Sequence, residues 1–90
     1  MRLAFSDRAV CDLMRLRDFI AVHDPGAAQR IAERLGGAVQ RLADNPHLGK
    51  AVEDLPDVRE WIVGRYVIRY VVAGDTLTVA RIWHGGEERQ

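Results

Sequence analysis

Apolar and polar residues alternate along the C-terminal third of the chain. Residues 57–84 read DVREWIVGRYVIRYVVAGDTLTVARIWH, and glycines at positions 64 and 74 interrupt the alternation. A period of two is typical of half-buried strands, and Gly-Asp suits a two-residue hairpin turn whose first residue needs a positive φ. The pattern therefore predicts three antiparallel strands joined by tight turns at Gly64 and at Gly74-Asp75.

The second turn also predicts the register of the last two strands, with Arg65 opposite His84. One predicted face carries the bulkier residues: Tyr66, Ile68, Tyr70, Val72, Leu77, Val79, Arg81 and Trp83. The other face carries Arg65, Val67, Arg69, Val71, Thr78, Ala80, Ile82 and His84. We expect the first face to pack on helices and the second, which holds three cationic or titratable groups, to carry function.

The N-terminal part of the chain predicts a strand and a helix. Residues 2–5 are a short apolar stretch, and Ser6 is a good N-cap for a helix from residue 7 to about residue 22. The apolar residues of this helix fall on one narrow stripe: Ala9, Leu13, Leu16 and Ile20. The helix is therefore expected to bury one face only.

A second helix is expected over residues 25–43, with Asp24 as its N-cap and Pro25 at its first position. Its apolar face comprises Ala28, Ile31, Ala32, Leu35, Ala38, Val39 and Leu42. The connection is so short that the two helices should form an antiparallel hairpin. Gly36 and Gly37 each cost about 1 kcal/mol against alanine, so the pair weakens the helix unless another backbone packs against Gly36.

Three arginines line up on the outward face of the second helix, namely Arg30, Arg34 and Arg41. One interpretation is an ordinary solvated helix face with Glu33 nearby. The other is a docking strip for an acidic segment of a partner.

The order of elements predicts an α+β fold. Asn45-Pro46 ends the second helix, and residues 47–56 read as a loop. The sequence thus gives strand, helix, helix and three strands, which corresponds to a helical hairpin on one face of a mostly antiparallel sheet. Ninety residues are enough for one domain, spanning residues 1–90.

Charge and cysteine content restrict the partners that we expect. Thirteen Lys and Arg balance thirteen Asp and Glu, so bulk attraction to nucleic acid is not expected. Cys11 is the single cysteine, which excludes an internal disulfide and gives no start to a metal cluster. No signal peptide or membrane span is visible, so we expect a cytoplasmic protein without metal or cofactor.

Several residues in this order resemble the ParE branch of the RelE/ParE toxin superfamily. They are Leu42, Pro46, Leu48, Gly49, Arg59, Tyr66, Tyr70, Arg81, Ile82, His84 and Gly85. The resemblance covers nearly the whole chain and implies the toxin of a bacterial type II toxin–antitoxin pair. It also implies a hetero-oligomer with a cognate antitoxin, which has a DNA-binding amino-terminal half and an acidic tail. Members of the ParE branch are associated with poisoning DNA gyrase, whereas their RelE relatives cut messenger RNA on the ribosome.

The chemistry of RNA cleavage favours the gyrase branch. Cleavage needs a base, a cation for the transition state and an acid for the leaving oxygen. RelE-type toxins resemble one another in placing an arginine after the central-strand aromatic residue, where this chain has Val67, and an aromatic acid/base near the C-terminus. A cation expected at the end of the last strand falls on His84, but residues 85–90 contain no tyrosine. We therefore expect a binding toxin rather than an enzyme.

Two alternatives stay open, and the site residues follow from the same reasoning. The chain is alternatively a ribosome-dependent endonuclease using His84 and Arg65, or a non-toxic relic that still binds antitoxin. Candidates for target binding are Arg65, Arg69, Trp83 and His84. Candidates for antitoxin binding are Arg30, Arg34 and Arg41. Arg81 and Trp61 are expected to be structural, with Arg81 hydrogen-bonded to backbone or an acidic group, and Arg69 has the alternative of pairing with Glu60 across the strands.

Overall fold

The computed structural model describes residues 1–87 and follows the predicted order of elements with one strand added. The elements are β1 (Arg2–Phe5), α1 (Asp7–His23), α2 (Ala28–Asp44), β2 (Lys50–Val52), β3 (Leu55–Val63), β4 (Tyr66–Ala73) and β5 (Thr76–His84). The α+β class, the helical hairpin and the meander are confirmed. The prediction of a loop over residues 47–56 is wrong at β2, which is only three residues long and too short to show alternation, and at residues 55–56, where β3 has already begun.

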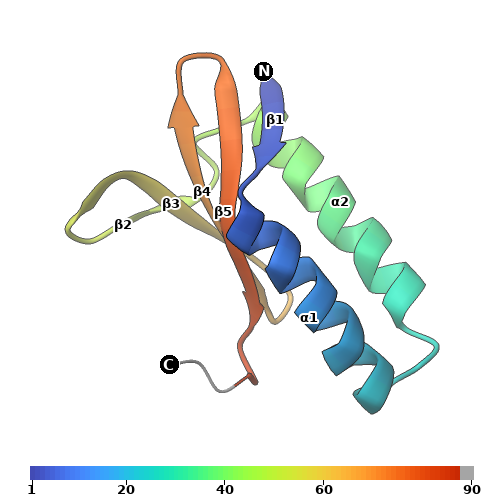
Figure 1. The fold of residues 1–90 in the computed structure, drawn as a ribbon. Helices are drawn as coiled ribbons and strands as arrows, with labels where there is room; N and C mark the ends of the chain where they lie inside the picture. The colour runs from blue at the N-terminus through green and yellow to red at the C-terminus, as the bar shows by residue number, and fades with distance from the viewer. Residues whose placement is uncertain (88–90) are drawn as a thin grey trace.

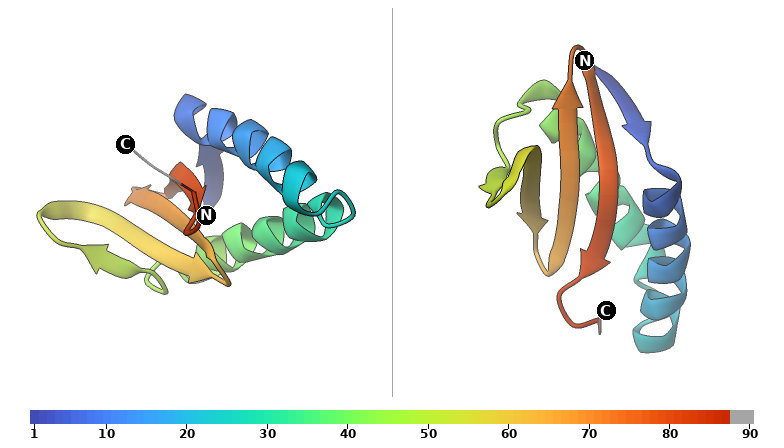
Figure 2. Two further views of the ribbon diagram at one scale, coloured as in Figure 1. Left: turned by 90° about the horizontal axis from the view of Figure 1, so that it is seen from below. Right: turned by 60° about the vertical axis from the view of Figure 1, so that its left-hand side comes forward.

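The five strands form one sheet in the order β1-β5-β4-β3-β2 (Figure 1). β1 pairs with β5 in parallel, and the other neighbours are antiparallel. The two helices run antiparallel to each other on one side of the sheet (Figures 1 and 2). The first strand of the fold therefore lies beside the last one.

The core lies between the helices and the sheet. Its largest fully buried apolar side chains are Tyr70, Leu16, Leu42, Ile68, Leu77, Ile82 and Val79. Ser6 caps α1 as predicted, because its hydroxyl accepts the Ala9 N–H at 3.0 Å and donates to the Ala80 carbonyl at 2.8 Å. The cap therefore also fixes the start of α1 against β5.

The predicted start of the second helix is wrong. Asp24 ends α1, since its N–H donates to the Ile20 carbonyl at 2.7 Å. Its carboxylate accepts the Gly26 N–H at 3.2 Å, and α2 begins only at Ala28. An Asp-Pro pair is as well suited to a turn as to a helix start, and here the aspartate closes the turn.

The register of β4 and β5 is correct near the turn and wrong beyond it. Tyr70 pairs with Val79 as predicted, but a bulge then leaves Ala80 without an opposite residue, and Arg69 faces Arg81. One inserted residue moves every later side chain of a strand to the other face. The predicted assignment of faces is therefore wrong for the second half of β5.

The bulge changes the surroundings of three predicted residues. His84 lies opposite Tyr66 rather than Arg65, and Ile82 enters the core beside Ile68. Trp83 lies opposite Val67 instead of on the helix-covered face. The bulge thus decides which side chains the end of the sheet presents.

A hydrogen-bonded loop joins the end of α2 to the centre of the sheet. The buried Tyr70 hydroxyl donates to the Pro46 carbonyl at 2.7 Å and accepts the Gly49 N–H at 2.9 Å. Arg59 donates to the Gly49 carbonyl at 2.7 Å. A Cβ at Gly49 would lie 2.5 Å from the Tyr70 hydroxyl oxygen, so only glycine fits this approach.

Candidate functional site

The end of the sheet at the β3–β4 turn brings Arg65 and His84 close together. The His84 ring contacts Tyr66 edge-on, with 4.9 Å between ring centroids, and Phe19 of α1 at 5.1 Å. Its Nδ1 accepts the Gly86 N–H at 2.8 Å, so the proton of the neutral ring lies on Nε2. A Cβ on Gly86 would lie 3.0 Å from the His84 ring and 3.8 Å from Arg65 Nη2, which places both side chains around one glycine.

The charge state of His84 limits the chemistry of this cluster. Burial lowers the pKa of His84 below its ordinary value, and the neighbouring Arg65 cation and His23 lower it further, although Glu87 opposes these effects. The imidazole is therefore neutral at pH 7. A neutral ring has no acidic proton to give a leaving oxygen, so the cluster presents one exposed cation beside a hydrogen-bond donor.

Arg69 and Trp83 are held within the sheet. Arg69 donates through Nε to Glu60 at 2.7 Å, and a second nitrogen lies 2.5 Å from the same carboxylate oxygen. Its guanidinium also lies over the Trp83 ring, 5.3 Å from the centroid. Trp83 is only 6% exposed. The structure thus contains the alternative cross-strand pair for Arg69 and leaves little of Trp83 for a target to contact.

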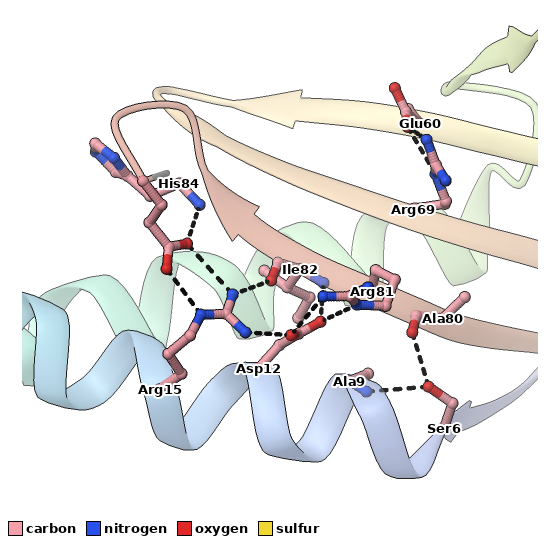
Figure 3. Close-up of polar contacts among 11 residues, drawn as sticks. Ser6, Ala9, Asp12, Arg15, Glu60, Arg69, Ala80, Arg81, Ile82 and His84 are labelled. Carbon is pink, nitrogen blue, oxygen red and sulfur yellow. Dashed lines mark hydrogen bonds and ion pairs between the residues drawn. The ribbon is translucent and has the colours of Figure 1, made fainter. Parts of the chain in front are cut away.

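A buried carboxylate on α1 is the centre of the most connected polar cluster (Figure 3). Asp12 is 2% exposed and accepts hydrogen bonds from Arg81 at 2.8 and 3.2 Å and from the Ile82 N–H at 2.9 Å. Arg15 donates to the same carboxylate, to the Ile82 carbonyl at 3.1 Å and to Glu87 at 2.7 Å. Arg81 is therefore bonded to an acidic group, as predicted, through a partner that the sequence did not reveal.

The pKa values of its two carboxyl groups show how strongly this cluster favours their ionised forms. Burial raises the pKa of Asp12, but the hydrogen bonds from Arg81, Arg15 and the Ile82 amide outweigh it and lower the pKa from 3.8 to about 2. Glu87 also has a lowered pKa, because the hydrogen bonds from Arg15 and the His84 amide outweigh the effect of burial. Both carboxylates are ionised at neutral pH, and the cluster joins α1 to β5.

The three arginines of the second helix do not behave alike. Arg30 donates to the Gly26 carbonyl at 2.9 Å and lies 3.7 Å from Asp24, so it belongs to the connection between the helices. Within residues 1–87, Arg34 and Arg41 have neither an ion pair nor a side-chain hydrogen bond. The predicted basic strip is thus reduced to two available guanidinium groups.

Arg34 and Arg41 border a shallow hollow between α2 and the β3–β4 turn. This basic hollow encloses about 450 Å³, and its lining residues are Arg34, Gly37, Ala38, Arg41, Trp61, Ile62, Val63 and Gly64. Ile62 is 67% exposed, whereas Trp61 is partly buried against the core. Gly64 has a φ of 60°, and its missing Cβ makes room for the Arg34 guanidinium. The hollow combines two unpaired cations with apolar surface.

Sequence reasoning missed Asp12, Arg15 and Glu87. Asp12 and Arg15 have the spacing of neighbours on a helix, which is a common surface pattern, and nothing local indicates that both bond to β5.

Among residues 1–87 no helix is long and apolar enough to span a membrane. The same residues contain no cluster of three or more side chains able to hold a metal ion.

Comparison with known proteins identifies the family. Residues 3–89 match the family model described as ParE toxin of type II toxin–antitoxin system, parDE. Toxin RelE1 of Caulobacter vibrioides is 39% identical over 88 residues, covering 93% of this chain and 92% of the relative. Toxin RelE2 of the same organism is 42% identical over 78 residues, covering 86% of each chain.

Two solved structures share the fold. A chain of the chromosomal ParDE system from P. aeruginosa superimposes with a TM-score of 0.81 at 24% identity, covering 93% of this chain and 95% of that one. A chain of the RelB–RelE antitoxin–toxin complex from Methanococcus jannaschii gives 0.62 at 24% identity, covering 90% and 88%. Because the family model matches nearly the whole chain, residues 3–89, this chain belongs to the ParE toxin family of type II toxin–antitoxin systems, within the RelE/ParE superfamily.

Proposed function

We propose that this toxin acts by binding, that its target is DNA gyrase, and that a cognate antitoxin neutralises it in a hetero-oligomer. The observation that carries the proposal is the sheet-end cluster, where Arg65 is an exposed cation and His84 is neutral. Within residues 1–87, no carboxylate or tyrosine hydroxyl bonds the His84 ring to complete an acid/base pair. Such a cluster supplies no acid for a leaving oxygen, whereas its exposed cation is suited to holding a partner surface.

The test is induced expression of the chain alone in bacteria, following plasmid supercoiling and protein synthesis in the same culture. Loss of supercoiling while translation continues supports the gyrase proposal. The purified protein should inhibit gyrase supercoiling, and an Arg65→Glu variant should lose this inhibition. Gyrase left fully active at a large molar excess of folded toxin would refute the target, and harmless expression would indicate a non-toxic relic.

Cleavage of messenger RNA on the ribosome is the second candidate. It is favoured by the names of the RelE relatives and by the closeness of Arg65 and His84. A His84→Ala variant that folds and no longer arrests translation, while exposed His47→Ala still does, would support it. Early translation arrest with cut transcripts would replace the gyrase proposal.

The basic hollow supplies a proposed contact for an acidic antitoxin tail. Arg34 and Arg41 have no acidic partner among the described residues, so a carboxylate from another chain would meet uncompensated cations there. Arg34→Glu should weaken antitoxin binding by roughly tenfold or more, because attraction becomes repulsion. Arg8→Glu on exposed α1 surface is the matched control, and equal affinities for the two variants would remove the hollow from the interface.

A further inference from the structure

β1 covers only the first part of one edge of β5, and side chains of α1 cover the next part. β1 pairs with residues 76–79 of β5 and then ends. Beyond that point the Ile82 N–H donates to Asp12 at 2.9 Å, and the Ile82 carbonyl accepts Arg15 at 3.1 Å (Figure 3). Side chains of α1 thus take the hydrogen-bonding positions that a longer neighbouring strand would occupy.

The turn after β5, residues 84–87, is bonded to α1 through Glu87. The His84 N–H donates to the Glu87 carboxylate at 2.8 Å, and the Glu87 N–H donates to the His84 carbonyl at 3.0 Å. Arg15 donates to the same carboxylate through Nε at 2.7 Å and through a second nitrogen at 3.3 Å. Only 9% of the Glu87 side chain is exposed, so the carboxylate is largely shielded from water. A charge-assisted, two-point contact of this kind holds the turn firmly.

The same turn is bonded to both residues of the sheet-end cluster. The Gly85 N–H donates to the Arg65 carbonyl at 2.7 Å, and the Gly86 N–H donates to His84 Nδ1 at 2.8 Å. The first bond ties the turn to the β3–β4 turn, and the second fixes the tautomer and the orientation of the imidazole. A displacement of the turn would therefore change what the cluster presents.

The guanidinium of Arg15 is already engaged within the chain. Its three nitrogens bind Glu87, Asp12 and the Ile82 carbonyl. The group is planar and its N–H groups point in fixed directions, so one arginine meets all three partners in a single arrangement. An effect of Arg15 on the target would therefore pass through these partners.

We propose that Arg15 is a positioning residue of the sheet-end cluster. Through Glu87 it holds the turn of residues 84–87 against α1, and this turn sets the orientation in which His84 and Arg65 meet the target. The inference rests on the proposed function, because that function assigns target binding to the cluster. It places a determinant of target binding on α1, far along the chain from the residues that it orients.

The experiment compares three substitutions in the full-length chain. Arg15→Gln removes the cation, and Glu87→Gln removes the charge of its partner but keeps a side-chain oxygen for the His84 N–H. Asp12→Asn disturbs the other side of the same guanidinium and leaves the bond between Arg15 and Glu87 in place. Thermal unfolding of each variant identifies the temperatures at which it is folded, and Glu87→Gln provides the test if Arg15→Gln does not fold.

NMR reports the position of the turn directly. In the wild type the Gly86 amide should be protected from hydrogen exchange by its bond to His84, and the ring should be the Nε2–H tautomer. Arg15→Gln and Glu87→Gln should each lower this protection by roughly tenfold, because the turn loses a hydrogen bond between charged groups. Asp12→Asn should change it less than about twofold, since the contact that holds the turn is kept.

Inhibition of gyrase supercoiling by the same proteins tests the consequence for binding. Arg15→Gln and Glu87→Gln should need roughly fivefold to tenfold more toxin, because apparent affinity falls with the fraction of molecules that are oriented for binding. The double variant should be no weaker than either single variant, because both changes break one contact. Arg15→Lys should recover part of the loss, since it keeps the charge but not the fork of donors. Asp12→Asn should stay within about twofold of wild type where it is folded.

Unchanged Gly86 protection in the folded Arg15→Gln or Glu87→Gln variant would overturn the inference and leave the proposed function intact. Unchanged inhibition despite a loosened turn would overturn it as well. So would an equal loss of inhibition in Asp12→Asn, because reduced stability would then explain both effects. If the wild-type chain does not inhibit gyrase, the proposed target is wrong, and Gly86 protection still decides whether Arg15 holds the turn.

Discussion

Replacing Asp12 by asparagine removes a charge from the carboxylate that joins α1 to β5. The shape is kept, so the loss comes from the hydrogen bonds of Arg81, Arg15 and the Ile82 amide. The fall in the pKa of Asp12 from 3.8 to about 2 corresponds, at about 1.4 kcal/mol per pKa unit, to about 2 kcal/mol of stability. The substitution also leaves two arginines short of a partner.

The total loss should be about 2–3 kcal/mol. Breaking a buried ion pair by removing one member costs about 3–5 kcal/mol, but water reaches both arginines, whose side chains are partly exposed. Arg15 also keeps its bond to Glu87. For a domain of this size the midpoint of thermal unfolding should fall by roughly 8–24 °C.

The assay is urea unfolding followed by circular dichroism, with Asp18→Asn as the control. Asp18 is on the same helix, 79% exposed and 3.7 Å from Arg17, so its substitution should change the free energy of unfolding by less than about 0.5 kcal/mol. A difference below about 0.5 kcal/mol between the Asp12 and Asp18 variants would refute the reasoning.

The stabilisation that Asp12 contributes should also depend on pH in a defined direction. The unfolded chain binds a proton at Asp12 near pH 3.8 and the folded chain near pH 2, so the contribution is complete above about pH 5 and is lost as the pH falls towards 2. The stability gap between wild type and Asp12→Asn should shrink by about 2 kcal/mol over that interval. A constant gap would mean that packing, not charge, is responsible.

Three further predictions concern single contacts. Gly49→Ala should lower the free energy of unfolding by about 1–3 kcal/mol in urea titrations, because the added Cβ meets the Tyr70 hydroxyl; an unchanged value would show that the loop shifts freely. Ser6→Ala should cost about 1 kcal/mol in the same assay through loss of the α1 cap, and no loss would contradict the capping role. Arg65→Gln should raise the pKa of His84, measured by NMR titration of its ring protons, because one of the effects that lower this pKa is removed; an unchanged value would show that Arg65 does not contribute to the lowering.

Local patterns predicted the elements of this fold well. Alternation and glycine turns gave the meander, and the helical hairpin followed from apolar spacing and a short connection. The bulge at Ala80 was not predictable. Both faces of the second half of β5 carry apolar residues, so the sequence pattern looks the same with or without an inserted residue. That one residue decides whether Ile82 or Trp83 lies on the face that the helices cover.

The candidate site was less predictable, because it depends on contacts between distant segments. Asp12 reads as a surface residue of α1 until β5 is placed against it. The difference between Arg30 and Arg34 is likewise absent from the helical pattern, which puts both on one face. Pairing that spans most of the chain has no local signature in a single sequence.

The parallel pairing of β1 with β5 has a consequence for folding during synthesis on the ribosome. β1 can pair only after residues 76–79 have been made, and Asp12 can bond to β5 only after Arg81 and Ile82 have been made. Synthesis proceeds at roughly 5–20 residues per second from the amino end. β1 and α1 are therefore made before β5, and the sheet cannot close until β5 has been made. A nascent chain stopped before residue 76 therefore lacks the fold, and an interrupted translation releases no finished toxin.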